Sequence, residues 1–240
     1  MVTFKERTHQ YFNDNGEEYY SVTKFLHCFE APFDKYGISL NVARKEGVTQ
    51  EEILKRWKEK SIAACEYGTA IHAKMEDYIK TGRREEGYEG LYQSFDDALG
   101  RDIKYAKAVH SEHILWNDQA KIAGTADLIV DLQDNEFLVA DFKTNGKFDF
   151  FSAYGNRMKD PVAHLSSCNY TIYSLQLSVY AYFHSLLTGR KCRNLLILYK
   201  EGERWTKIPV CNMQHEVMVL FDYYRKHPEL LAPKVYGYQS

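Results

Sequence analysis

Two segments of the sequence place carboxylates and a lysine where they could bind a cation and act on a substrate. Asp127 lies in AGTADLIVDL, and Asp141 and Lys143 lie two positions apart in FLVADFKT. Both segments are rich in strand-forming residues and are predicted to be strands. Side chains two apart on a strand share a face, so Asp141 and Lys143 point to the same side. A carboxylate in the apolar run FLVADF is costly to bury unless it is paired or bound to a metal.

The length of the turn between these strands relates Asp127 to Asp141. If the turn contains three residues, for example 133–135, Asp127 lies directly opposite Asp141, whereas a turn of two or four residues breaks this match. Directly opposed Cβ atoms are about 4.5–5.5 Å apart, so the two carboxylates repel unless they share a cation such as Mg²⁺. The alternative is a salt bridge between Asp141 and Lys143, because a D-x-K triplet alone usually marks a surface strand.

Further polar residues lie on predicted helices and on a third strand. His72 and Glu76 are four apart in GTAIHAKME and share a helix face. Glu112 lies in the strand VHSEHILW, and Gln176 and Tyr180 are four apart in YSLQLSVYAYF. Each has an ordinary structural explanation when taken alone: a hydrogen-bonded histidine, solvated glutamates, or helix packing. The functional alternative is that these side chains complete a metal shell or hold a phosphate, a water or the lysine.

Taken in order, GTAIH, IAGTADLI, VADFKT and QLSVY resemble the PD-(D/E)XK nuclease superfamily, specifically its RecB-like exonuclease branch. The resemblance covers roughly residues 68–180 and rests on four motifs with compatible spacing. Phage-encoded nucleases and the mitochondrial genome-maintenance exonuclease are similar in general organisation, so a phage source is one expectation. The resemblance implies an α/β (α+β) fold with a restriction-endonuclease-like core, in which helices flank a central mixed sheet and a cleft lies at the bend of the acidic hairpin.

The resemblance also implies a role for each matching residue. Four positions correspond to metal ligands, the last through its backbone carbonyl: His72, Asp127, Asp141 and Phe142. Lys143 takes the position of the catalytic lysine, which acts together with Asp127 and Asp141. Gln176 and Tyr180 match a Q-x-x-x-Y element that supports the active site and the DNA strand, and Glu76 and Glu112 fit less specific positions beside the site. The implied reaction is phosphodiester hydrolysis, in which Mg²⁺ or Mn²⁺ lowers the pKa of a bound water.

Three functions remain open at this level. The leading one is an exonuclease that acts at DNA ends in recombination, repair or replication. A structure-specific or restriction-like endonuclease would use the same residues, and a catalytically silent DNA-binding or assembly protein would keep the fold. The chain has no Walker motif, so a helicase or recombination partner would be a separate chain. Related iron–sulfur nucleases hold their cluster with a C-terminal group of three cysteines, which Cys192 and Cys211 do not form, so no iron–sulfur cluster is expected.

Composition indicates one globular domain over residues 1–240. The 240 residues are 45% hydrophobic and 15% aromatic, enough for one sizeable core. The net charge is -2, so the chain does not carry the broad basic surface of many non-specific nucleic-acid binders. Contacts with DNA must therefore be local. Five cysteines without a C-x-x-C pair predict reduced thiols, and no apolar run reaches the length of a signal peptide or a membrane span. We therefore expect a cytoplasmic protein without a membrane partner.

Turn and capping signals divide the domain into three parts. Residues 1–67 form an N-terminal hairpin and helical elaboration, with a tight turn at Asn15-Gly16, a helix capped by Ser21 and a charged helix opened by a capping box at Thr49. Residues 68–200 form the catalytic core, and residues 201–240 add a strand and a closing helix. The predicted elements are helices over 69–82, 89–107, 173–187 and 212–227, and strands over 109–116, 122–132, 136–144, 195–200 and 204–210.

Overall fold

The computed structural model describes residues 1–5, 8 and 10–231 of the chain. Its strands form one mixed sheet in the order β1-β2-β3-β5-β6-β7-β8, with β4 paired to β5. The strands are β1 (Val2–Lys5), β2 (Gln10–Asn13), β3 (Glu18–Ser21), β4 (Ala108–Asn117), β5 (Ile122–Asp131), β6 (Glu136–Lys143), β7 (Lys191–Glu201) and β8 (Arg204–Val210). The helices are α1 (Val22–His27), α2 (Lys35–Glu46), α3 (Gln50–Thr81), α4 (Glu89–Lys104), α5 (Asn169–Thr188), α6 (Gln214–Lys226) and the short 3-10 helix η2 (Pro228–Leu230).

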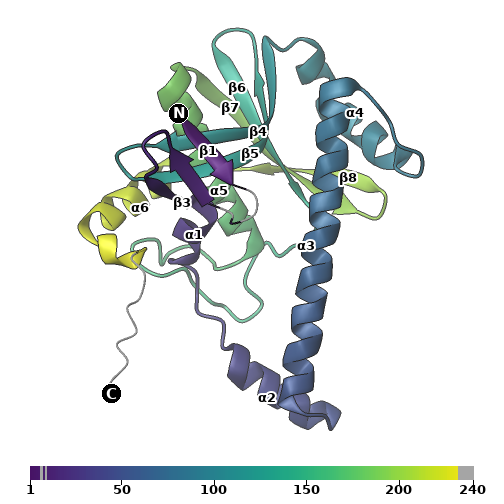
Figure 1. The fold of residues 1–240 in the computed structure, drawn as a ribbon, viewed down its shortest axis with the longest axis vertical. Helices are drawn as coiled ribbons and strands as arrows, with labels where there is room; N and C mark the ends of the chain where they lie inside the picture. Colours follow the sequence, from purple (N-terminus) through teal and green to yellow (C-terminus); the bar gives the residue numbers. More distant parts are fainter. Residues whose placement is uncertain (6–7, 9, 232–240) are drawn as a thin grey trace.

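Helices cover both faces of this sheet (Figure 1). On one face α1, α5 and α6 form an apolar cluster that includes Phe25, Leu175 and Leu220. On the other face α4 and the C-terminal part of α3 form a second cluster, which includes Met75 and Phe95. The β3–β5 and β6–β7 pairs are parallel, and the other pairs are antiparallel. The prediction of a central mixed sheet flanked by helices is confirmed.

The predicted turns and helix caps are largely confirmed. Gly16 has a φ of 78° in the turn between β2 and β3, and the Ser21 side chain accepts a hydrogen bond from the backbone N–H of Lys24 at the start of α1. The helix α4 ends earlier than predicted, because the backbone N–H of Lys107 already donates to the carbonyl of Asp131 on β5. The predicted C-terminal strand and helix correspond to β8 and α6, and residues 232–240 lie outside the described residues.

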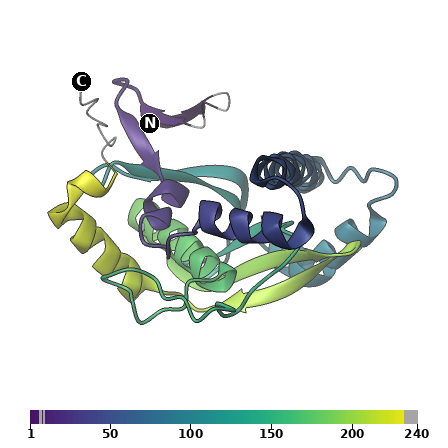
Figure 2. The same cartoon turned by 90° about the horizontal axis from the view of Figure 1, so that it is seen from below.

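The helix α3 runs for 32 residues without a break at Gly68. Thr49 caps its start by accepting a hydrogen bond from the Glu52 N–H, and Gly82 ends it in the left-handed conformation. The sequence left open whether a new helix starts at Thr69, and the structure shows that one helix continues through position 67. The N-terminal half of α3 and the helix α2 project from the body of the protein (Figure 1), and we call this part, residues 35–66, the arm. Figure 2 shows α3 almost along its axis.

The strands β4 and β5 both kink at the level of Glu112 and Asp127. On β5, Ala126 faces the apolar cluster under α1, α5 and α6 (the α5 cluster), and Leu128 faces the cluster under α3 and α4 (the α3–α4 cluster). On a regular strand, residues two apart would share a face. The ladder between β4 and β5 keeps one register on both sides of this level, which sets Glu112 opposite Asp127. Glu112 has a φ of 50°, in the left-handed region. The kink therefore turns both carboxylates away from the regular alternation of the sheet.

A gap in the sheet lies next to this kink. The strand β3 pairs with β5 only as far as Ala123, and β6 pairs with β5 only from Leu128 onward. Gly124 lies within this gap, where a Cβ atom would be 2.7 Å from Cε1 of Tyr180 and 2.9 Å from Cγ2 of Val22. The absence of a side chain at position 124 thus lets Tyr180 of α5 approach the backbone of β5.

Replacing Gly124 with Ala is expected to lower the free energy of unfolding by about 1–3 kcal/mol, because the new methyl group overpacks a buried contact. Urea unfolding followed by far-UV circular dichroism measures the change. Gly146→Ala is the matched control, since a Cβ atom at position 146 has nothing within 4 Å. Equal stability of the two variants would show that the contact with Tyr180 yields without cost.

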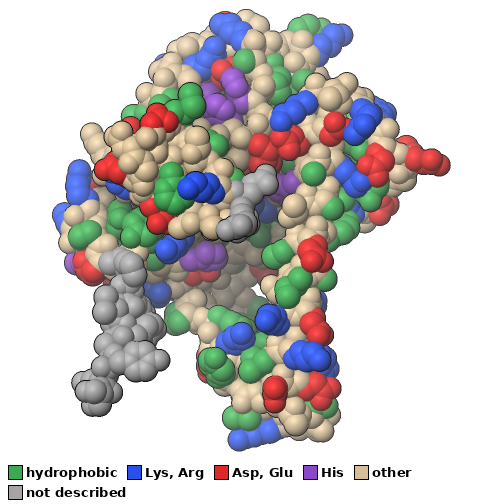
Figure 3. Space-filling view, in the orientation of Figure 1, with side chains coloured by type: hydrophobic (Ala, Val, Ile, Leu, Met, Phe, Trp, Pro, Cys, Tyr) green, Lys and Arg blue, Asp and Glu red, His purple; other side chains and the backbone are tan. Residues whose placement is uncertain are grey.

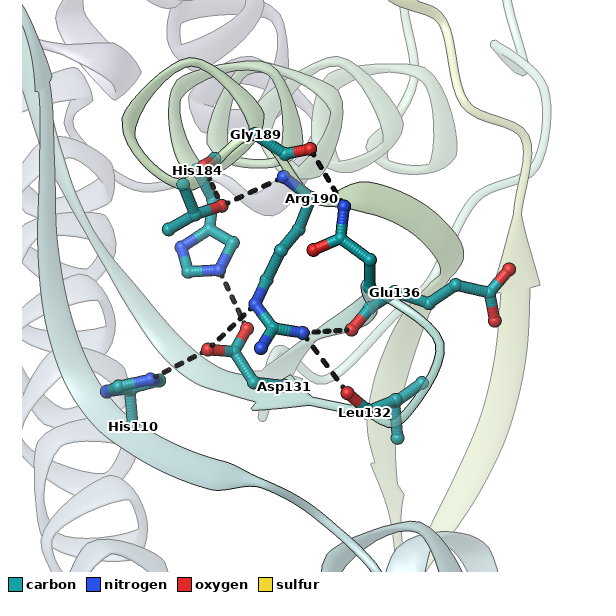
Figure 4. A network of polar contacts seen from close by, with 9 residues as sticks. His110, Asp131, Leu132, Glu136, His184, Gly189 and Arg190 are labelled. Atoms are coloured by element: carbon teal, nitrogen blue, oxygen red, sulfur yellow. Dashed lines mark hydrogen bonds and ion pairs between the residues drawn. The ribbon is translucent and has the colours of Figure 1, made fainter.

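A polar network joins the end of β5 to α5 (Figure 4). Asp131 accepts a hydrogen bond from Nε2 of His184 at 2.9 Å and lies 3.4 Å from Nε2 of His110 and 3.6 Å from Nε of Arg190. Arg190 also donates to the carbonyls of Leu132 and Glu136 at 3.1 and 3.2 Å, which closes the β5–β6 turn. Partners on three sides of the Asp131 carboxylate hold its pKa below the ordinary value, against the effect of burial.

The stabilising contribution of His184 should depend on pH. Burial lowers the pKa of His184 below its ordinary value, so the folded state favours the neutral ring. The contribution is therefore fully present above about pH 6.5, the unfolded value, and is lost as the pH falls through the lower folded value. We expect His184→Gln to cost more stability at pH 8 than at pH 5.5. Paired urea titrations of the variant and the parent protein in EDTA measure this difference, and a pH-independent difference would contradict it.

None of the helices over the described residues combines the length and apolar character that a bilayer span requires. All five cysteines are unpaired in the structure.

Candidate active site

A cleft of about 740 Å³ opens between α3, the β1–β2 strands and the kink in β4 and β5. In the space-filling view the surface is hollowed beside α3, and Asp and Glu side chains gather near its upper part (Figure 3). Residues far apart in the sequence line the cleft, among them Phe4, Tyr11, His72, Glu76, Glu112 and Asp127. The cleft therefore brings together residues that the sequence placed on separate elements.

The predicted turn of three residues between β5 and β6 is confirmed. The backbone N–H of Leu132 donates to the carbonyl of Glu136 at 2.8 Å, and the ladder runs in that register to the pair Leu128–Ala140. One further step along the same register sets Asp127 opposite Asp141. At this level Oδ2 of Asp127 accepts a hydrogen bond from the backbone N–H of Phe142 at 2.7 Å. Glu112, Asp127 and Asp141 thus form a row of carboxylates across three adjacent strands.

His72, Glu112 and Asp127 offer ligand atoms that all lie within 4.8 Å of one another. The Nδ1 atom of His72 is 3.5 Å from Oδ2 of Asp127, across the cleft from α3 to β5. The sequence set Glu112 beside the site, since its register was unknown, but the structure puts Glu112 within this group. Asp141 is outside it, because its carboxylate turns toward Lys143.

Asp141 and Lys143 begin a polar chain that leads to α5. The ammonium of Lys143 lies 2.5 Å from Oδ2 of Asp141 and 3.4 Å from Oε1 of Gln176. The side chain amide of Gln176 in turn donates to the hydroxyl of Tyr180 at 3.0 Å. Tyr173 lies beneath the same ammonium, with its ring centroid 4.6 Å away. Gln176 of the predicted Q-x-x-x-Y pair therefore contacts the predicted lysine directly, and Tyr180 contacts Gln176.

Burial and nearby charges set the protonation of the central groups. Burial raises the pKa of Asp141, and the Asp127 carboxylate raises it further, to about 6. Burial acts in the same direction on Asp127, but His72 holds the pKa of Asp127 below its ordinary value. Burial lowers the pKa of His72, and Asp127 outweighs that effect and raises it to about 9. Burial lowers the pKa of Lys143, but Asp141 and Asp127 together outweigh it and raise this pKa above its ordinary value.

Glu112 carries the remaining unusual carboxyl group of the cleft. Glu112 is exposed as a whole residue, but partial burial of its carboxyl group, followed by the charge of Asp127, raises its pKa to about 7. Without a metal ion the site at neutral pH thus balances its negative charge with protonated His72 and Lys143. A divalent cation would supply the same compensation and allow His72 to act as a neutral ligand.

The residues present fit a divalent cation. Asp141 is only 2% exposed, and among the described residues its Oδ2 atom has an ion-pair contact but no hydrogen-bond partner. The group of one imidazole and two carboxylates suits Mg²⁺ or Mn²⁺, which prefer oxygen ligands and tolerate a nitrogen ligand to different extents. The protein would hold such an ion with His72, Glu112 and Asp127, and Asp141 lies next to them.

Two further sequence-predicted residues have other contacts. Glu76 lines the cleft but forms an ion pair with Lys80 one helical turn away. The Phe142 side chain packs against Phe95 and Trp205 in the α3–α4 cluster, so only its backbone belongs to the site. The role of the Phe142 carbonyl as a ligand stays a prediction.

Sequence reasoning missed the aromatic wall that β1 and β2 add to the cleft. The rings of Phe4 and Tyr11 lie 4.8 Å apart, and the Tyr11 hydroxyl is 2.9 Å from Oγ1 of Thr125 on β5. The Asn15-Gly16 turn predicted a hairpin, but it predicted neither the strand β1 that carries Phe4 nor where these strands would pack. The lysine-facing position of Tyr173 was missed for the same reason, since the sequence gives no register between α5 and β6.

Comparisons with known proteins show distant structural likeness alone. No protein-family model matches the chain, and no curated protein matches it in sequence. A candidate exonuclease from Eubacterium rectale has a TM-score of 0.39 and 15% sequence identity, over 68% of this chain and 66% of that protein. The solved structure of SSO0001 has a TM-score of 0.37 and 14% identity, over 89% of this chain and 77% of that protein. The chain thus spans just under two thirds of the first protein, and the functional argument rests on its own residues.

Proposed function

We propose that this chain is a divalent-metal-dependent DNA nuclease that hydrolyses phosphodiester bonds at DNA ends. The observation that carries the proposal is a group of convergent ligand atoms in one cleft, with an ion pair on the adjacent strand. His72, Glu112 and Asp127 have convergent ligand atoms, and the buried pair of Asp141 and Lys143 lies one strand away. A structural salt bridge would explain the pair alone, but it would leave the convergent imidazole and carboxylates without a partner.

Each residue has a chemical task in this proposal. The ammonium of Lys143 can donate a hydrogen bond to a phosphate oxygen or to the attacking water, because its contacts with Asp141 and Gln176 leave one of its three protons for another acceptor. Gln176 and Tyr173 fix the direction of that ammonium from α5. Asp141, with a pKa of about 6, can accept a proton from the water near neutral pH. A bound Mg²⁺ or Mn²⁺ would lower the pKa of water and neutralise charge on the phosphate.

Digestion of DNA labelled at the 5′ end, at the 3′ end or closed into a circle tests the proposal. We expect both labelled linear substrates to be degraded with Mg²⁺ or Mn²⁺ and none with EDTA, while the circle stays intact. Asp127→Asn should abolish the activity, because it weakens the contact with His72 and removes a charged ligand. The control is Asp97→Asn, since Asp97 is an exposed residue on α4 and outside the cleft.

Activity in EDTA, or full activity of the Asp127→Asn variant, would exclude the proposed mechanism. Cleavage of the closed circle would instead identify an endonuclease that uses the same residues. Binding of DNA without any cleavage, in the presence of either metal, would identify a silent DNA-binding protein. We also propose that a helicase or recombination partner of this chain is a separate chain.

A further inference from the structure

We propose that His110, His113 and His184 form a second metal site, which takes Zn²⁺ and fastens α5 to the strand β4. This site is distinct from the cleft and contains none of its residues. The three rings belong to two elements that are far apart in the sequence, since His110 and His113 lie on β4 and His184 lies on α5. Histidine side chains reach the molecular surface in the region of β4 (Figure 3).

The spacing of the three rings is close to that of imidazoles around one ion. Their centroids are 4.8 Å apart for His110 and His113, 6.0 Å for His113 and His184, and 6.3 Å for His110 and His184. Zn–N bonds of about 2.0–2.1 Å put the centroids of imidazoles in a tetrahedral site roughly 5 Å apart. The ring nitrogens do not converge within the 4.8 Å that spans the ligand atoms of the cleft, so the proposal requires the rings to move closer together when the ion binds.

Asp131 prepares two of these rings for binding. It accepts from Nε2 of His184 at 2.9 Å, and Nε2 of His110 lies 3.4 Å from its other oxygen (Figure 4). A ring that donates its Nε2 proton to a carboxylate carries a lone pair on Nδ1, and this arrangement is typical of metal-binding histidines. The Arg190 guanidinium lies 3.6 Å from the same carboxylate and keeps it anionic.

The Nδ1 atom of His184 is the second, independent observation. The His184 side chain is 2% exposed, and its Nδ1 has no hydrogen-bond partner within the described part of the chain. A buried nitrogen lone pair without a partner is costly, and a metal ion satisfies it. His110 and His113 are only partly buried, so an ion can reach this nitrogen from solvent.

The ligand set selects the class of metal. Three imidazole nitrogens suit Zn²⁺ and other borderline transition metals, whereas Mg²⁺ prefers a shell made mainly of oxygen ligands. Three protein ligands leave a fourth position for water, as in open zinc sites. Because β4 pairs with β5 alone among the described strands, an ion that links β4 to α5 would brace a free edge of the sheet.

Zinc titration of a chain whose cleft is blocked tests the proposal. The blocked protein carries His72→Ala and Asp127→Asn, and calorimetry with ZnCl₂ should detect one remaining Zn²⁺ per chain. Adding His113→Ala to the blocked protein should weaken binding at least about 10-fold, because it removes one of three ligands. His215→Ala, at an exposed position on α6, is the matched control and should leave binding unchanged.

X-ray absorption at the zinc edge provides a readout that needs no change in the three histidines. The blocked protein should show three imidazole ligands around the ion. No bound Zn²⁺, binding that His113→Ala leaves intact, or fewer imidazoles in the spectrum would each overturn the proposal. Because the cleft is disabled throughout, these results do not depend on whether the chain is a nuclease.

Discussion

Replacing Lys143 with Met should reduce DNA cleavage by about 10²–10³-fold while the protein stays folded, because one charged hydrogen-bond donor is lost from the reacting centre. The Met side chain fills a similar volume, so packing against Tyr173 is kept. The Asp141 carboxylate loses its counterion at 2.5 Å, which should lower stability in EDTA. Single-turnover cleavage at saturating Mn²⁺, together with thermal unfolding with and without the metal, measures both effects.

The combination of these two results separates a catalytic lysine from a structural one. If Lys143 only neutralises Asp141, added Mn²⁺ should restore both the stability and the cleavage rate of the variant. If Lys143 acts on the substrate, Mn²⁺ restores stability and leaves the rate low. Lys121→Met serves as the control, since Lys121 pairs with Glu17 on the surface and should lose no activity.

Replacing Asp131 with Ala should lower the free energy of unfolding by about 3–5 kcal/mol, since removal of one partner leaves a buried charge without compensation. The Asp131 side chain is 11% exposed and holds His184 and Arg190 together at the end of β5. Without it the Arg190 guanidinium keeps, within the described part of the chain, only the two carbonyls of the β5–β6 turn. Urea unfolding at pH 7 measures the loss.

The control for this change is Asp97→Ala. The Asp97 carboxylate pairs with Arg204 at 3.6 Å on an exposed surface. An exposed pair of this kind contributes about 0–1 kcal/mol. A loss below about 1 kcal/mol for Asp131→Ala would mean that water replaces the carboxylate and that the network does not hold α5 in place.

The residues that the sequence predicted well share one property: a short local signal decides their position. The relation of Asp127 to Asp141 follows from a turn of three residues, and that turn is local. Glu112 was harder, because its level relative to Asp127 depends on the β4–β5 turn and on a kink in both strands. A left-handed φ at a glutamate, here 50°, has no signature in the sequence.

Long-range contacts account for what the sequence did not predict. Gly68 resembles a helix end, yet α3 continues through it, and the missing side chain leaves room for Thr144, whose Oγ1 would lie 3.0 Å from a Cβ atom. The meeting of His110, His113, His184 and Asp131 depends on how α5 crosses the sheet. The wall formed by Phe4 and Tyr11 depends on how the N-terminal strands pack against the cleft, since both residues are ordinary strand aromatics in the sequence.

The unbroken course of α3 makes the projecting arm and His72 parts of one stiff rod. At about 1.5 Å per residue, its 32 residues span about 48 Å. Ile71 and Met75 anchor the C-terminal portion of α3 in the core, so the arm extends from an anchored segment that contains His72. A tilt of the far end would therefore swing the imidazole relative to Asp127, whose Oδ2 atom lies 3.5 Å from Nδ1 of His72.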